Sequence, residues 1–528
     1  MELKGRSFIG SAAVMEAGKT FTAINPATNS PQPPNYYSAS VADVDRAAQL
    51  ATKAFVAYRR KNGEERATFL REIANGIDAI VDALVVRVNQ EAGLNEARVR
   101  SEAGRTSFQI RMFADLIEDG SWVRATIDHG DINRKPQPKP DLRSMYRPLG
   151  PVAVFGASNF PLAYSVAGGD TASAFAAGNP VIVKAHPAHP GTSEMIGDVI
   201  LAAARATSMP DGVFSLLFDA GTEIGTALVK HPLVRAVGFT GSQRGGRALM
   251  DLAAARPAPI PVFAEMGSTN PVFLLPHALA ARTEEIAKGM SASVTLGAGQ
   301  FCTKPGLIFM NSGVDAESFA KNLTARIADS PTQVMLTPGI HSAYMNGAAA
   351  RGKQTGVAVA AQGKAAAGET GVRGLPTLFS TTGKNILRDH ALSEELFGPE
   401  SVMVNCTGRE EMLEIARGLS GHLTATVHGT EEDLREYAEL IDILEQKAGR
   451  LVFNGFPTGV EVNNAIVHGG PYPATSDGQS TSVGTPAIHR FARPVCYQNF
   501  PQSALPDELK EGNPLEIWRL VDGNFMKG

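Results

Sequence analysis

Cysteine is scarce in this chain. Only three cysteines occur in 528 residues, an odd number, and none of them forms a CxxC pair. This pattern argues against a disulfide framework and against a zinc site, and it indicates free thiols in a reducing, cytoplasmic compartment. We therefore expect no metal centre, and any cysteine chemistry must come from a single thiol.

Long apolar runs and an excess of one charge are also missing. No stretch reaches the roughly 18 apolar residues that a membrane-spanning helix needs, and the N-terminal segment has no apolar signal-peptide core. The 49 basic and 53 acidic residues nearly balance, for a net charge of -4. Without a dense basic block the chain is not suited to nucleic acid. We expect neither a membrane nor a nucleic acid as partner.

The sequence does contain short β-branched runs that alternate with stretches of helical length. The runs PVAVFG, NPVIVKA, VRAVGFTGS and PVFAEMG are separated by stretches such as 162–177 and 191–204. A second alternation follows residue 302, with GLIFM, ESVMVN and TATVHG as predicted strands. This arrangement is typical of βαβ units and a parallel sheet, so the predicted fold class is α/β.

Two helices and an arm are predicted before this alternation. Ser40 and Asp43 can form a capping box for the first helix. Apolar positions from Leu70 to Leu84 predict one further helix. Between residues 130 and 150, three closely spaced prolines exclude a regular helix, so we interpret that segment as an arm or linker.

Polar or glycine-containing stretches follow four predicted strands. They are GASNFP, KAHPAHP, FTGS and EMGSTNP. Ligands of parallel sheets bind at the carboxyl ends of the strands, so these stretches are candidate site segments. No GxGxxG follows any predicted strand, and an ordinary dinucleotide-binding fingerprint is therefore absent.

Six stretches in order make the chain resemble the aldehyde dehydrogenase superfamily. They are SNFP at 158–161, Lys184 at a strand end, FTGS at 239–242, EMG at 265–267, GQFC at 299–302 and EELFGP at 394–399. The resemblance covers nearly the whole chain, and six motifs in the right order are far more specific than any one alone.

The resemblance implies a domain organisation. It implies a Rossmann-type parallel-sheet cofactor domain, an α/β catalytic domain and a small oligomerisation element. These are expected at residues 1–124 with 151–263, at 264–480, and at 125–150 with 481–528, respectively. It also implies a homodimer or homotetramer in which the arm contacts a partner subunit.

The family's reaction assigns catalytic roles to three residues. A thiolate adds to an aldehyde, the thiohemiacetal gives up hydride to a nicotinamide, and water hydrolyses the resulting thioester. Cys302 is the expected nucleophile, Asn159 the donor to the oxyanion and Glu265 the base that activates water. The alternatives are a small buried thiol, a turn residue and a surface ion pair. Cys406 and Cys496 lack a comparable context and are expected to be structural.

The expected cofactor is NAD or NADP. By resemblance, Lys184 binds the adenosine ribose, and Gly241 and Ser242 face the pyrophosphate near a helix start. Glu395 is expected to bind the nicotinamide ribose, and Phe397 to pack against the nicotinamide.

The preference between the two cofactors stays open. Pro187 stands where NAD-preferring relatives often carry a glutamate, so no carboxylate at that position repels a 2′-phosphate. NADP should therefore be tolerated. No arginine is obviously placed to attract the phosphate.

The substrate expectation comes from the subfamily. EMGSTNP and the ending NGFPTGV…HGGPYPATSDG resemble 2-oxoglutarate semialdehyde (2,5-dioxovalerate) dehydrogenases, which act in sugar-acid or hydroxyproline catabolism, with NADP-linked fatty aldehyde dehydrogenases as the alternative. The residues expected to line the aldehyde passage are Phe160, Ala163, Tyr164, Ala167, Phe301, Thr303 and Phe456. The hydroxyls of Tyr164 and Thr303 favour the keto acid over a fatty chain.

Two functions from other classes remain open at this point. A thioester-forming acyl transferase also needs a cysteine, an oxyanion hole and a base, but it has no need of EELFGP or of Lys184 at a strand end. A non-catalytic binding protein on the same fold is not excluded by fold alone.

Overall fold

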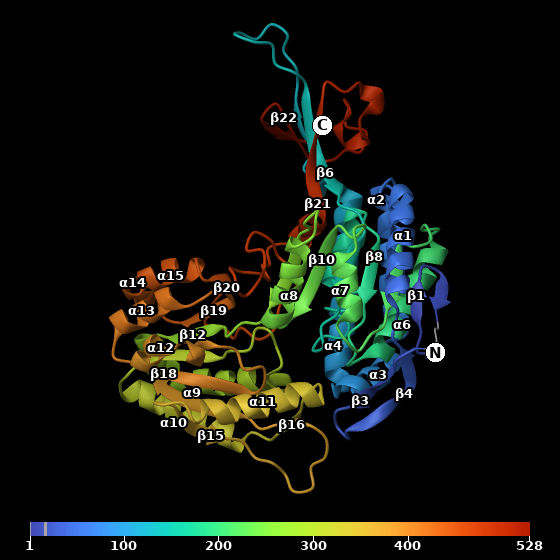
Figure 1. Cartoon of the computed structure of the whole chain (residues 1–528). Helices are drawn as coiled ribbons and strands as arrows, with labels where there is room; N and C mark the ends of the chain where they lie inside the picture. Colours follow the sequence, from blue (N-terminus) through green and yellow to red (C-terminus); the bar gives the residue numbers. More distant parts are fainter. Residues whose placement is uncertain (1, 15–17, 528) are drawn as a thin grey trace.

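The computed structural model describes residues 2–14 and 18–527. Residues 1 and 15–17 of the predicted cofactor domain and residue 528 of the predicted C-terminal segment lie outside the described residues. Figure 1 shows two lobes side by side and a sheet that projects from one of them. Each lobe contains one seven-stranded sheet with helices packed against it, so the predicted α/β fold class is confirmed.

The first lobe is built on a sheet of order β11-β10-β7-β8-β9-β1-β2. Its strands are β1 Ser7–Ile9, β2 Ala12–Val14, β7 Val152–Phe155, β8 Val181–Lys184, β9 Phe214–Leu217, β10 Ala236–Gly241 and β11 Val262–Met266. The five strands from β11 to β9 are parallel, and β1 and β2 add an antiparallel edge.

Helices cover both faces of this sheet. They are α1 Val41–Tyr58, α2 Gly63–Ala79, α3 Val81–Ala92, α4 Glu96–Asp119, α5 Gly169–Ala177, α6 Pro190–Ala206, α7 Glu223–Lys230 and α8 Gln243–Ala254. Val152 and Val154 pack into one core with α2, α4, α5 and α6, whereas Ala153 packs into another with α1 and α7. Burial on both faces explains why these strands are short continuous apolar runs.

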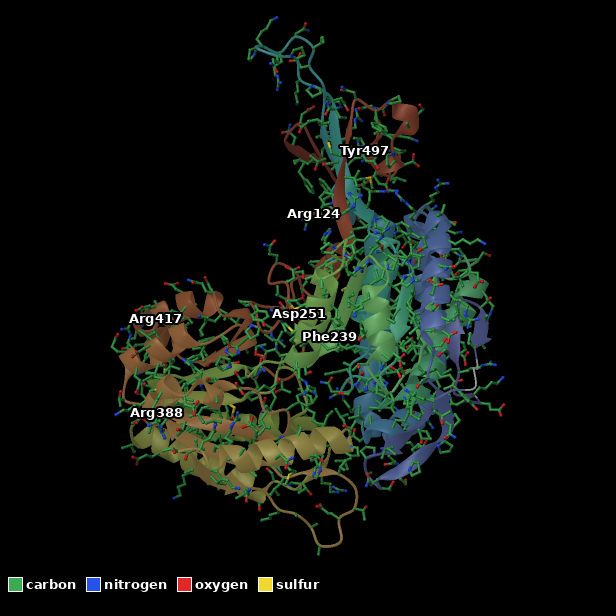
Figure 2. All side chains as sticks on the ribbon, in the orientation of Figure 1. Arg124, Phe239, Asp251, Arg388, Arg417 and Tyr497 are labelled. Carbon is green, nitrogen blue, oxygen red and sulfur yellow. The ribbon has the colours of Figure 1, made fainter. Side chains whose placement is uncertain are left out.

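The second lobe has a sheet of order β15-β17-β18-β13-β12-β19-β20. Its strands are β12 Pro271–Leu274, β13 Leu307–Asn311, β15 Ala358–Gln362, β17 Thr377–Thr382, β18 Glu400–Cys406, β19 His422–His428 and β20 Ala448–Phe453. All neighbours are parallel except the pair β15–β17. Its helices are α9 Pro276–Thr295, α10 Val314–Asp329, α11 Pro338–Arg351, α12 Gly383–Arg388, α13 Arg409–Gly418, α14 Glu431–Glu436 and α15 Ala438–Glu445. Arg388 and Arg417, on α12 and α13, mark its outer surface in Figure 2.

The projecting sheet joins the predicted arm to the C-terminal segment. Its order is β21-β6-β5-β22-β23, with β5 Thr126–Asp128, β6 Leu142–Pro148, β21 Ala492–Gln498, β22 Arg519–Val521 and β23 Asn524–Met526. The proline-rich segment between β5 and β6 contains no helix, as predicted. β21 pairs with β6 along seven residues.

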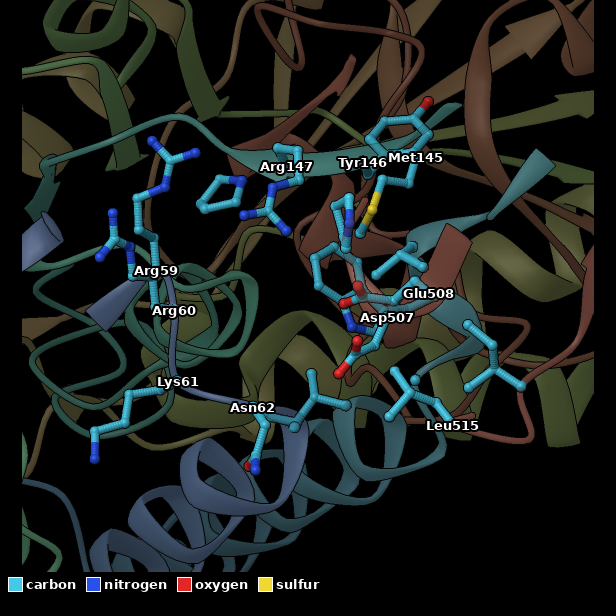
Figure 3. A pocket seen from close by; sticks show the side chains of 18 of the residues that line it. Arg59, Arg60, Lys61, Asn62, Met145, Tyr146, Arg147, Asp507, Glu508 and Leu515 are labelled. Atoms are coloured by element: carbon cyan, nitrogen blue, oxygen red, sulfur yellow. The ribbon is translucent and has the colours of Figure 1, made fainter. Parts of the chain in front are cut away.

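A cavity lined by basic and acidic side chains lies at the base of this sheet. Its volume is about 730 Å³, and none of the predicted site residues lines it. In Figure 3, Arg59, Arg60 and Arg147 stand on one side, and Asp507 and Glu508 on the other.

Local predictions met with mixed success. The capping box of Ser40 and Asp43 is confirmed. The single helix predicted over Leu70 to Leu84 is wrong, because Ile80 leaves helical geometry and separates α2 from α3. The helix predicted from Leu162 is also wrong in its start: α5 begins only after Gly168, and residues 162–168 form turns.

No helix among the described residues is long and apolar enough to cross a membrane. The predicted domain boundaries stay predictions. Strand β11 continues the first sheet across the boundary placed between residues 263 and 264, so Glu265 lies on a strand of the first lobe.

Candidate functional site

Cys302 lies between two cavities. A cavity of about 480 Å³ is bordered on one side by Cys302, and a second of about 440 Å³ borders its other side. Of the predicted site residues, the first is lined by Asn159, Phe160, Tyr164, Gly241, Ser242, Glu265, Cys302, Glu395 and Phe397. The second is lined by Phe160, Tyr164, Phe301, Cys302 and Thr303. We call the first the cofactor-side cavity and the second the aldehyde-side cavity.

The loop that carries Cys302 is held by buried polar contacts. The side-chain Nδ2 of Asn270 donates to the carbonyl oxygens of Cys302 at 2.8 Å and Lys304 at 2.9 Å. The Nζ of Lys304 donates to the backbone oxygen and to Oε1 of Glu400, at 2.7 and 2.8 Å. At Gly299, where φ is +64°, a Cβ would lie 2.3 Å from the Gly398 oxygen. The glycines and the lysine around Cys302 therefore fix the loop.

A histidine connects the candidate nucleophile to the candidate base. His468 Nε2 lies 3.3 Å from Cys302 Sγ, and His468 Nδ1 lies 3.1 Å from Glu265 Oε2. His468 and Glu265 are only 3% and 4% exposed. Burial alone would lower the pKa of His468, but electrostatic interactions with Tyr164 and Cys302 and hydrogen bonds with Cys302 and Glu265 raise it well above its ordinary value. The arrangement can remove a proton from the thiol and hold it on the imidazole.

Glu265 has a second cationic neighbour. Arg490 Nη2 lies 3.9 Å from Glu265 Oε1, while Arg490 Nη1 bonds to Asp170 Oδ1 at 2.9 Å. The backbone N–H of His468 donates to Thr481 Oγ1 at 2.9 Å, which fixes the segment that carries the imidazole. The carboxylate and the histidine are thus both positioned by neighbours outside the two cavities.

Asn159 follows strand β7 and faces the Cys302 loop. Its Nδ2 donates to the Gln300 carbonyl at 3.1 Å. A side-chain amide nitrogen carries two hydrogens, so one donor remains for a second acceptor. Since Asn159 and Cys302 both line the cofactor-side cavity, this donor is available to an oxygen formed on the carbon that bonds to Cys302.

The far end of the cofactor-side cavity suits a phosphate group. Ser242 is the N-cap of α8, and its hydroxyl accepts a bond from the Gly245 N–H at 3.2 Å. The first N–H groups of a helix favour an anion. Phe239, labelled in Figure 2 on β10, packs so closely over Gly241 that a Cβ there would lie 2.5 Å from its ring. Backbone can therefore approach a ligand at Gly241.

Glu395, which is predicted to bind the nicotinamide ribose, lies directly over Gly267. A Cβ at Gly267 would lie 1.7 Å from Glu395 Oε2, so this carboxylate needs glycine beneath it. Burial raises the pKa of Glu395 to about 7, and Lys304 opposes the shift only in part. Phe397 lines the same cavity. A carboxylate, an aromatic ring and a helix start in one elongated cavity fit a dinucleotide, which would supply a hydride acceptor when bound.

Lys184 lies at the end of β8, beside the cofactor-side cavity without lining it. Its Nζ donates to the Asp219 carbonyl at 2.6 Å. Burial lowers the pKa of Lys184 to about 8, and the nearby Asp219 carboxylate opposes this shift. Asp219, which no sequence motif singled out, follows β9 and brings a negative charge to the region where the adenosine ribose is expected.

Phe456 is one of three residues predicted for the aldehyde passage that line neither cavity. Its ring packs against His428, with the ring centroids 5.2 Å apart, and against α9, where a Cβ at Gly289 would lie 2.1 Å from it. From the same loop, Gly459 and Val460 line the aldehyde-side cavity instead. Ala163 and Ala167 line neither cavity and border a small space between α4 and α5.

Sequence reasoning missed four residues of this site. His468 belongs to HGGPYPATSDG, a stretch that indicated only the subfamily. It lies 166 residues after Cys302 in the chain, so its contact with the thiol is not visible in the sequence. Asn270 was read only as part of EMGSTNP. Arg98 and Arg105 on α4 line the aldehyde-side cavity, and nothing in the sequence before them signals a site.

A metal has no evident place beside Cys302. Among the described residues, the only group of three side chains able to share an ion is His277, Glu432 and Glu436, at the surface.

Known proteins resemble the chain over its whole length. The sequence profile of the aldehyde dehydrogenase family matches residues 13–475. The chain is 51% identical over 524 residues to "Alpha-ketoglutaric semialdehyde dehydrogenase 2" of Azospirillum brasilense, with 99% of each chain covered. It is 45% identical over 526 residues to "Alpha-ketoglutaric semialdehyde dehydrogenase" of Acinetobacter baylyi, again with 99% of each covered.

Solved structures share the fold. An aldehyde dehydrogenase from Pseudomonas syringae in complex with NAD+ and octanal matches with a TM-score of 0.80 at 21% identity, over 95% of this chain and 98% of that one. The resemblance inferred from the six motifs is confirmed. The protein belongs to the aldehyde dehydrogenase family and is an NAD(P)-dependent enzyme that oxidises an aldehyde to a carboxylate.

Proposed function

We propose that this enzyme oxidises 2-oxoglutarate semialdehyde (2,5-dioxopentanoate) to 2-oxoglutarate, in sugar-acid or hydroxyproline catabolism. The observation that carries the reaction is Cys302, in contact with His468 and accessible from two cavities. The choice of substrate is supported by two relatives, 51% and 45% identical over 99% of the chain, that are named for this semialdehyde.

The first half of the reaction is thiol addition. His468 accepts the proton of Cys302, and the thiolate adds to the aldehyde carbon. Asn159 Nδ2 and the Cys302 backbone N–H donate to the oxyanion of the thiohemiacetal. NAD or NADP, held by Gly241, Ser242, Glu395 and Phe397, would supply the hydride acceptor, and the acyl group then remains on Cys302 as a thioester.

The second half is hydrolysis. Glu265 lines the cofactor-side cavity but not the aldehyde-side cavity, so the water that it activates enters from the cofactor side. Glu265 takes the proton of this water, the hydroxide adds to the thioester carbon, and the C–S bond breaks to release the acid and the thiolate. The contact with His468 gives Glu265 a further part in the first half, since it orients the imidazole.

One comparison tests the activity and its substrate together. The enzyme is incubated with NAD or NADP and 2-oxoglutarate semialdehyde, hexanal or decanal, and the absorbance of the reduced cofactor is followed. We expect the highest kcat/KM for the semialdehyde. A higher value for decanal would assign the enzyme to the fatty aldehyde group. No absorbance rise with any aldehyde would instead favour a non-catalytic binding protein.

We also propose a homodimer or homotetramer in the cytoplasm, with the predicted cofactor domain at 1–124 and 151–263. Three apolar side chains of the projecting sheet support a partner subunit: Trp518, Leu520 and Phe525 are 42%, 38% and 69% exposed. All three cysteines are free thiols, which suits a reducing compartment. Sedimentation should give more than one subunit at micromolar concentration, and a monomer would contradict the proposal.

A further inference from the structure

Two arginines line the aldehyde-side cavity. Arg98 and Arg105 both come from α4, seven residues apart and therefore on the same face of the helix. The rest of the cavity wall is largely aromatic or apolar and includes Phe160, Phe301 and Val460. Two guanidinium groups in such a cavity need a physical explanation, because a partly buried cation is costly unless an anion offsets it.

Arg98 lies between two aromatic rings. Its guanidinium carbon is 4.4 Å from the ring centroid of Phe160 and 4.5 Å from that of Phe301. Its Nη2 is 3.4 Å from the Asn159 carbonyl and 3.6 Å from Glu102 Oε2. Phe301 precedes Cys302 in the chain, and Asn159 is the predicted donor to the oxyanion. Because Arg98 contacts both of these residues, it lies beside the reacting centre.

Arg105 is the second guanidinium of the cavity. Its Nη2 donates to the Tyr164 hydroxyl at 3.0 Å, and its guanidinium carbon is 5.1 Å from the Tyr164 ring centroid. Its Nε is buried and has no partner among the described residues. Arg105 therefore keeps an unsatisfied donor next to a cavity that also borders Cys302.

The charges around this cavity do not balance. Glu102 is the only acidic side chain in the lining. Its Oε1 already accepts the backbone N–H groups of Leu162 and Ala163, at 2.9 and 3.0 Å. One carboxylate thus faces two guanidinium groups, and the cavity keeps an excess of positive charge that an anionic ligand can offset.

We propose that Arg98 and Arg105 bind the carboxylate of the substrate while its aldehyde carbon reacts with Cys302. The inference rests on the proposed function, from which it takes a substrate with an aldehyde at one end and a 2-oxo acid at the other. Four carbon–carbon bonds separate the two ends, which is about 5 Å in an extended chain. Arg98 packs on the ring of Phe301, the residue that precedes Cys302 in the chain.

The same arginines discriminate against fatty aldehydes. An alkyl chain in the aldehyde-side cavity would displace water from both guanidinium groups and offer them no acceptor. Sites that leave a buried polar group unpaired reject the wrong ligand far more strongly than apolar pockets reject an extra methylene. The arginine pair is thus the specificity-determining feature of this cavity.

Substitution of each arginine with glutamine tests the proposal. Arg98→Gln and Arg105→Gln are compared with the unchanged enzyme on 2-oxoglutarate semialdehyde, on 5-oxopentanoate, which keeps the carboxylate but lacks the keto group, and on pentanal, which lacks both. Each substitution should lower kcat/KM for the two acids by about 10- to 150-fold, the range for a lost bond to a charged group. The loss should fall mainly on KM, and kcat/KM for pentanal should fall far less than kcat/KM for the acids.

The controls separate recognition from folding. Arg100→Gln removes an exposed α4 arginine that pairs with Glu96 and Asp82, and it should leave all three substrates unaffected. Arg105→Lys keeps the charge without the planar fork and should recover part of the loss for the acids only. Pentanal turnover reports on whether each variant retains an intact active site.

The outcomes distinguish the two proposals. If both glutamine variants oxidise the acids as well as the unchanged enzyme does, or if they lose equally on acids and pentanal, the carboxylate site is wrong. If the unchanged enzyme itself prefers pentanal or decanal to the semialdehyde, the proposed function fails instead. Titration of the product 2-oxoglutarate into each protein gives a second readout: its affinity should fall in both glutamine variants, and an unchanged affinity would overturn the inference.

Discussion

Replacement of His468 with asparagine removes the group that lies between Cys302 and Glu265. His468 Nε2 is 3.3 Å from Sγ, and the contacts around it raise the pKa of His468 well above its ordinary value. A histidine with a raised pKa is suited to accept the proton of the thiol beside it. An ordinary thiol with a pKa of about 8.5 is only about 3% ionised at pH 7. His468→Asn removes this proton acceptor and should slow thiohemiacetal formation by roughly 10²- to 10⁴-fold at pH 7, the range for a lost general base.

The pH dependence gives this prediction its specificity. In the variant, the lost rate should return as pH rises towards 9, because hydroxide then ionises the thiol without help. The assay is the pre-steady-state burst of reduced cofactor, measured between pH 6 and 9 in both proteins. His428→Asn is the matched control, since His428 is 1% exposed and packs against Phe456 rather than Cys302. A burst slowed by the same factor at every pH would refute the role in thiol ionisation.

Further predictions concern the nucleophile loop, the base and the cofactor site. Cys302→Ala should abolish oxidation. Glu265→Gln should give a burst of about one equivalent of reduced cofactor and then stall at the thioester, and the burst should be slower because His468 loses its carboxylate partner. A missing burst would mean that Glu265 is required for hydride transfer itself, and its assignment as the hydrolytic base would be wrong. The unchanged enzyme should turn over both NAD and NADP, and a preference for NAD beyond about a thousandfold in kcat/KM would show that Pro187 does not leave the 2′-phosphate tolerated. Asp219→Asn removes a negative charge near the expected ribose site and should raise kcat/KM for NADP relative to NAD. Burial raises the pKa of Glu395 to about 7, above its unfolded value, so its contribution to stability is present below the unfolded pKa and is lost as pH rises through about 7. Glu395→Gln should therefore flatten the fall in Tm between pH 5 and pH 8. A parallel fall of Tm in both proteins would contradict this prediction. Asn270→Ala leaves two buried carbonyls of the Cys302 loop without their donor and should cost about 1–3 kcal/mol of stability together with activity, so an unchanged Tm would argue against the anchoring role.

The sequence could predict the strands of both lobes and the family, because buried parallel strands appear as short apolar runs and the motifs follow their ends. It could not predict the break at Ile80, since apolar spacing continues across a change of backbone direction. It also missed His468, Arg98 and Arg105, which reach Cys302 only through contacts between segments far apart in the chain. Phe456 was misassigned for the reverse reason: an aromatic residue near the right loop found its place against Gly289, a neighbour that spacing does not reveal.

The position of Cys302 between two cavities imposes an order on events in the active site. Of the two cavities, Glu265 lines only the cofactor-side cavity, and Arg98 and Arg105 line only the aldehyde-side cavity. Water that Glu265 activates would therefore approach the thioester from the cofactor-side cavity. The hydride acceptor and the water would then use the same cavity one after the other. The acid product, held on the opposite side, does not have to leave by the same route.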